Sequence, residues 1–141
     1  MRCLTAVPIE PEDLASLEAV AQDRVGAVVA FTGLVRADRQ GSRIVTALDY
    51  EAYIPMAERQ IQRLVDQAQA RWSLEAVYIQ HRIGLVETGQ ISVVVIVAAS
   101  HRAEAYAASQ FLIEGIKHEV PMWKHECYDD AAAMEDLHAH V

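Results

Sequence analysis

The feature that most constrains this chain is a run of nine residues, Ile91–Ala99, in which only Ser92 is polar. The run is too short to span a bilayer, because a membrane helix needs about 20 apolar residues. It is rich in valine and bounded by polar residues, which is typical of a strand buried on both faces. We therefore predict that residues 91–99 form a central strand of a sheet.

The rest of the chain predicts helices and strands around this run. Three segments begin with helix-start residues or have apolar residues at helical spacing, and they are predicted as helices: 8–23, 55–71 and 100–119. Four further segments are predicted as strands: 26–35, 44–53, 75–83 and 122–128. Two polar or glycine-containing segments are predicted as a mobile loop, 37–43, and a turn, 84–90. This order predicts an α+β fold with one main sheet, and a length of 141 residues fits a single domain over 1–141.

Composition excludes several classes of protein. Hydrophobic residues make up 52% of the chain, which excludes disorder as its main state. The net charge of −8 argues against general nucleic-acid binding. The first residues contain no long apolar segment, and Cys3 and Cys127 form no paired motif, so we expect neither a signal peptide nor a disulfide framework. The simplest interpretation is a reduced, cytoplasmic protein.

The two lysines are unusual in their placement. The chain has ten arginines, but its only lysines, Lys117 and Lys124, lie within eight residues of each other. A desolvated lysine can lose its proton, which arginine cannot do. If the two lysines share a cleft, each disfavours the charge of the other, and one of them could act as a base or nucleophile.

Three other basic residues are candidates for binding an anion. His101 and Arg102 follow Ser100, the predicted N-cap of the helix over 100–119. Cations in a first helical turn oppose the helix dipole unless an anion lies between them, although both side chains could equally point into water. Arg36 follows the strand over 26–35, and its guanidinium suits phosphate.

No metal site is predicted. The possible ligands near the C-terminus match no established zinc spacing: His125, Cys127, His138 and His140. His81 lies in a predicted strand and is expected to be packed or half-exposed. Spacing alone therefore indicates an anion-binding α+β domain and leaves a lysine-dependent enzyme as an open possibility.

Five segments, in order, carry a resemblance to a known family. They are GAVVAFTGLVR at 26–36, ALDYEAYIPMAERQI at 47–61, HRIG at 81–84, SHRAEAY at 100–106, and Lys117 followed by PMWK at 121–124. Together they resemble the catalytic (large) subunits of molybdopterin synthase. The resemblance covers about residues 25–126 and leaves the tail over 129–141 uncertain.

The resemblance implies a fold and a reaction. The family has an α/β hammerhead fold with an additional small antiparallel sheet, and it forms a homodimer. A small ubiquitin-like sulfur-carrier subunit, which ends in a Gly-Gly thiocarboxylate, inserts its C-terminal tail into the large subunit. Sulfur is transferred onto cyclic pyranopterin monophosphate to form the molybdopterin dithiolene, without a metal or other cofactor.

The resemblance also implies site residues. Lys117 and Lys124 match the family's active-site lysines, and the anion-binding and pocket-lining positions match Arg36, His101, Arg102, Phe31 and Ile113. In the family the pocket is completed across the dimer, so His101 and Arg102 are expected to serve the partner's site. Family members often carry a further arginine near the C-terminus, but no Arg or Lys follows Lys124 here. This departure leaves an alternative, a non-catalytic subunit that docks the carrier or binds a phosphorylated pterin.

Overall fold

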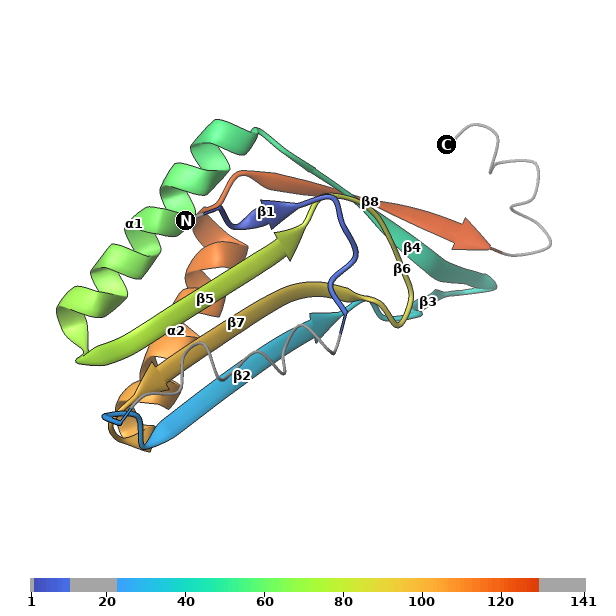
Figure 1. Ribbon diagram of the computed structural model, residues 1–141. Helices are drawn as coiled ribbons and strands as arrows, with labels where there is room; N and C mark the ends of the chain where they lie inside the picture. The colour runs from blue at the N-terminus through green and yellow to red at the C-terminus, as the bar shows by residue number, and fades with distance from the viewer. Residues whose placement is uncertain (1, 11–22, 130–141) are drawn as a thin grey trace.

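The computed structural model describes residues 2–10 and 23–129 (Figure 1). Its two helices are α1 (Ile54–Arg71) and α2 (Arg102–Glu119). They agree with the helices predicted over 55–71 and 100–119 to within two residues at each end. The helix predicted over 8–23 lies almost entirely outside the described residues.

The main sheet has four strands in the order β1 (Leu4–Thr5), β5 (Leu74–Arg82), β7 (Ile91–Ala99) and β2 (Ala27–Leu34). β7 runs antiparallel to both of its neighbours, and β1 is parallel to β5. All nine residues of β7 are buried. The predicted central strand is therefore confirmed, because an interior strand covered on both faces has no side that favours polar residues.

Both helices lie on one face of this sheet and form the main core with it (Figure 1). Ile61 and Leu64 of α1, Ile79 of β5 and Leu112 of α2 are almost fully enclosed. Burial of each such side chain contributes about 1.5–3 kcal/mol. The helices approach closely at Gly115, where an added Cβ would lie 2.6 Å from a methyl carbon of Leu64.

A second, antiparallel sheet extends from one end of the main sheet (Figure 1). It is built on the ten-residue strand β4 (Arg43–Ala52), which pairs with three others: β3 (Arg39–Gln40), β6 (Gly84–Glu87) and β8 (Met122–Asp129). The α+β class with an added antiparallel sheet is thus confirmed. Neither described helix is long and apolar enough to cross a membrane.

Two predictions about connections were wrong. The segment 84–90 begins with strand β6, whose Val86 is fully buried, and is not only a turn. The segment 37–43 contains β3, which forms a tight hairpin with β4 around Gly41 (φ +66°), and is not an open loop. In both cases the pairing partner is β4, so the strand depends on contacts that the local sequence does not contain.

The predicted N-cap of α2 was also wrong. Ser100 precedes the cap, which is His101, and no side-chain hydrogen bond caps the helix. The ladder between the edge of β2 and β7 continues to this point, because the Gly26 amide donates to the Ala99 carbonyl at 3.0 Å. A Cβ at position 26 would lie 2.2 Å from the Ser100 carbonyl oxygen, so only glycine fits where the two backbones approach each other.

Candidate active site

A cavity of about 200 Å³ lies where the C-terminal end of α2 meets β4, β5 and β8. We call it the lysine cavity, because Lys117 and Lys124 both line it. Its other lining residues are Tyr50, His81, Ile116, Val120, Met122 and Trp123. The two lysines that are close in sequence therefore also share one hollow in space.

The chain path explains this convergence. Lys117 lies in the last turn of α2, which ends at Glu119 before Pro121 redirects the chain into β8. The antiparallel pairing of β8 with β4 then places Lys124 directly opposite Tyr50. Because directly opposed residues of a ladder point to the same face, Lys124 returns toward the end of α2.

The uncharged wall of the cavity is formed by His81 and Tyr50. His81 is 6% exposed, and its ring meets that of Tyr50 edge to face with the centroids 5.1 Å apart. Burial lowers the pKa of His81 to about 4; the Arg82 carbonyl opposes this shift, and the nearby Lys117 charge adds to it. Burial also raises the pKa of Tyr50, and the smaller effect of Ser92, which lowers this pKa, does not cancel the rise. Both rings are therefore neutral at pH 7, and no carboxylate lines the cavity among the described residues.

His101 and Arg102 lie at the opposite end of α2. Both are exposed, and they line a shallow depression together with Gly26, Ser100 and Ala103. From Arg102 to Lys117 the helix advances 15 residues, which is about 22 Å along its axis. Within a single chain these residues therefore do not share a site with the lysines.

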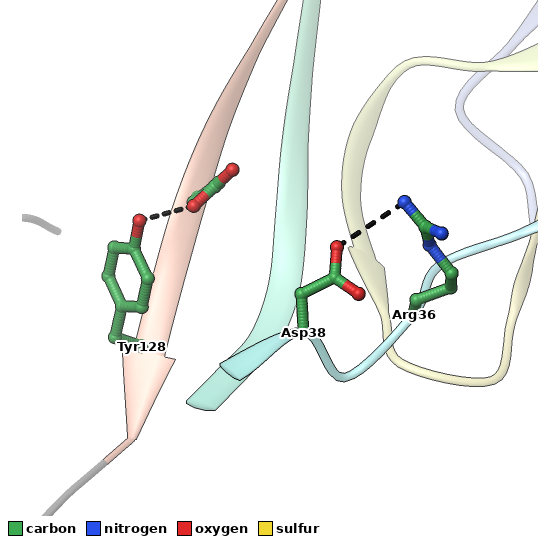
Figure 2. Close-up of polar contacts among 4 residues, drawn as sticks. Arg36, Asp38 and Tyr128 are labelled. Atoms are coloured by element: carbon green, nitrogen blue, oxygen red, sulfur yellow. Dashed lines mark hydrogen bonds and ion pairs between the residues drawn. The ribbon is translucent and has the colours of Figure 1, made fainter. Parts of the chain in front are cut away.

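The remaining predicted residues are also away from the lysine cavity. Phe31 and Ile113 line a third depression, between β2 and α2, beside the exposed Tyr106. Arg36 follows β2, with 81% of its side chain exposed, and forms an ion pair with Asp38 at 3.5 Å (Figure 2). A single chain thus holds the predicted residues at several separate places.

Comparison with known proteins decides the family. The family model described as "MoaE protein" matches residues 4–119. The molybdopterin synthase catalytic subunit of Staphylococcus carnosus (strain TM300) is 45% identical over 107 residues, which are 76% of this chain and 71% of that protein. The chain belongs to the family of molybdopterin synthase catalytic subunits.

Solved structures agree with this assignment. Molybdopterin synthase from Staphylococcus aureus superposes with a TM-score of 0.81 at 38% identity, covering 91% of both chains. A chain from Helicobacter pylori 26695, solved as a protein–protein complex of subunits 1 and 2 of molybdopterin-converting factor, has a TM-score of 0.75 over 94% of this chain and 90% of that chain. At 20% identity, that second likeness concerns the fold alone.

Tyr50 and His81, which form the uncharged wall of the lysine cavity, were not among the predicted site residues of this MoaE-family chain. Tyr50 lies within the family segment 47–61, and His81 begins the HRIG segment. Motif membership was the only signal for either residue. Of the two expectations for His81, packed or half-exposed, the structure shows the first. Strand periodicity does not show that this buried ring borders a cavity formed by three other elements.

Neither Cys3, which precedes β1, nor any metal-binding group among the described residues forms a competing catalytic centre. Cys3 is 1% exposed, and burial together with Glu58 raises the pKa of its thiol to about 11. It is therefore a poor candidate for carrying sulfur as a thiolate. Across residues 2–10 and 23–129, no group of three or more potential ligands is arranged to hold a metal ion, and His138 and His140 lie outside these ranges.

The lowered pKa of His81 predicts a pH-dependent stability. The unfolded chain binds a proton on this residue below about pH 6.5, whereas the folded chain does so only near pH 4. Stability should therefore fall as the pH drops through this window. Between pH 7 and pH 5 we expect His81 to account for about 2 kcal/mol of the lost unfolding free energy.

Urea unfolding of the wild type and of His81→Asn at pH 7, 6 and 5 checks this expectation. Other titrating groups are common to both proteins, so the difference between the two pH dependences isolates His81. Equal losses in the two proteins would show that His81 titrates normally in the folded state.

Proposed function

We propose that this chain catalyses the sulfur-transfer step of molybdenum cofactor biosynthesis. It would take sulfur from the thiocarboxylated C-terminus of a small ubiquitin-like carrier subunit and place it on cyclic pyranopterin monophosphate, which gives the molybdopterin dithiolene. Membership of the catalytic-subunit family supports this proposal. The observation that carries it is the lysine cavity, in which two cations lie against neutral walls.

The size and charge of the cavity suit the end of a carrier tail. Its volume of about 200 Å³ is below the roughly 300–1,000 Å³ of ordinary small-molecule pockets. A thiocarboxylate is a small anion, and two ammonium groups without a lining carboxylate favour it. A larger pterin substrate would then need walls supplied by another surface.

Lys117 and Lys124 divide the chemistry in this proposal. Lys124 holds the incoming thiocarboxylate, and Lys117 acts at the pterin as a general acid–base group or a transient covalent partner. Charge that develops beside the acyl carbon during release of sulfur is stabilised by a positioned ammonium, by a few kcal/mol. The family resemblance and the shared cavity support an active-site role for both lysines, and the division of roles between them is part of the proposal.

A second copy of the chain completes the site. Arg36, His101 and Arg102 would bind the substrate phosphate, and Phe31 and Ile113 would line the pocket. The rigid length of α2 keeps Arg102 about 22 Å from Lys117 in one protomer. We therefore propose a homodimer in which His101 and Arg102 of one protomer serve the lysines of its partner.

The carrier would dock beside the cavity. Exposed apolar side chains cluster in the segments that border it, at the end of β4, the start of α1 and the start of β8: Tyr53, Ile54, Met56 and Trp123. Exposed aromatic and methionine side chains are typical of protein interfaces. Docking here would let a flexible C-terminal tail reach Lys124, and we place the whole assembly in the cytoplasm.

The alternative is a subunit that binds the carrier or the pterin without turnover. The observation in its favour is the absence of Arg or Lys after Lys124. Against it, lysine is retained at two positions of one cavity in a chain that otherwise uses arginine. The alternative predicts binding without product.

Reconstitution tests the proposal. The purified protein is mixed with thiocarboxylated carrier and cyclic pyranopterin monophosphate, and the dithiolene is measured after oxidation to its fluorescent derivative. We expect product, and none when the carrier ends in an ordinary carboxylate. Carrier binding without product would instead support the docking subunit.

A further inference from the structure

We propose that His81 is a further substrate-binding residue of the lysine cavity, where its Nε2 atom accepts a hydrogen bond from an N–H group of a bound reactant. The proposal rests on the proposed function, since it places the reactants in this cavity. It adds an acceptor to a site that is otherwise described by its cations.

The orientation of the ring is set by the backbone. His81 Nδ1 lies 2.7 Å from the Arg82 carbonyl oxygen. Because a carbonyl can only accept, Nδ1 carries the proton and donates. In a neutral imidazole the other nitrogen, Nε2, is then left with a lone pair and no proton.

The Nε2 atom is free and open to the cavity. No hydrogen bond joins it to any residue in the described ranges. This unpaired atom is also not fully enclosed, although the residue as a whole is only 6% exposed. Because His81 lines the lysine cavity, we infer that the exposed part of Nε2 faces this cavity.

A neutral acceptor suits this place better than a charged one would. Lys117 and Lys124 offer donors only. A carboxylate here would pair with the lysines and repel an anionic reactant. The buried imidazole beside Lys117 stays neutral, so it can accept a hydrogen bond while the positive field of the cavity is preserved.

The donor can come from either of two reactants. The pterin ring carries N–H groups, and so does the glycine backbone at the end of the carrier tail. Both offer the same chemistry to Nε2. Separate titrations with each reactant distinguish these two sources.

Two variants separate the acceptor from the structural hydrogen bond. In His81→Asn the side-chain amide can still donate to the Arg82 carbonyl, but nothing occupies the position of Nε2. In His81→Gln the longer side chain can place its carbonyl oxygen near that position. Calorimetry at pH 7 measures the Kd of each variant for carrier without thiocarboxylate and for cyclic pyranopterin monophosphate, and thermal unfolding measures the Tm.

We expect His81→Asn to weaken binding of one of the two reactants about tenfold, the effect of one lost hydrogen bond, with little change in Tm. His81→Gln should recover most of that affinity. An unchanged Kd for both reactants, or equal losses in both variants together with a lower Tm, would overturn the proposal and leave His81 a structural residue. These titrations need no turnover, so failure of the reconstituted reaction and failure of this proposal are distinguished.

Discussion

Lys117→Ala is expected to reduce kcat/KM for dithiolene formation by about 10²–10³-fold, the usual effect of removing one group that stabilises transition-state charge. Lys117 lies in the last turn of α2 and is exposed to the lysine cavity, so its removal leaves no void in the core. We therefore expect the Tm to change little. Steady-state rates with saturating carrier and varied pterin substrate measure the loss.

Two further variants show what the ammonium contributes. Lys117→Arg keeps the positive charge but cannot transfer a proton near neutral pH or form a covalent adduct. If Lys117 acts as an acid–base or covalent group, Lys117→Arg should be nearly as slow as the alanine variant. His118→Ala is the matched control, because His118 is exposed on the same helical turn, pairs with Glu114 and does not line the cavity. Near-normal turnover of Lys117→Ala would rule out a catalytic role.

Heterodimers are expected to reveal a site shared between protomers. When a Lys117→Ala protomer is paired with an Arg102→Ala protomer, one of the two sites still combines an intact Lys117 with an intact Arg102 from the other chain. Such heterodimers, isolated with two different affinity tags, should retain about half of the wild-type activity. Each variant homodimer should be strongly impaired.

The reciprocal arrangement is the control. A double variant, Lys117→Ala with Arg102→Ala, is paired with a wild-type protomer. If the site is shared, both sites of this heterodimer lack one residue, and activity should be close to that of the variant homodimers. If each protomer instead holds a complete site, the pattern reverses: this heterodimer keeps about half of the activity, and the first one loses it.

Local signals in the sequence determined the main elements of the fold. The apolar run Ile91–Ala99 required an interior strand, because nine residues without a polar side must be covered on both faces. Pro121 required that α2 end close to Glu119. The ordered motifs determined the family, and the concentration of lysine at 117 and 124 pointed to the cavity that both residues line.

Contacts between distant segments decided the rest. β3 and β6 are strands because β4 pairs with them, and with two and four residues their own sequences are too short to predict it. His81 and Tyr50 reach the lysine cavity because β5, β4, β8 and α2 converge there. The sequence of no single segment indicates this convergence. The separation of Arg102 from Lys117 follows from the rise of one straight helix, 1.5 Å per residue. Local periodicity determined both helices and the longer strands, whereas only the packing of those segments decided where the short strands form and which side chains share a site.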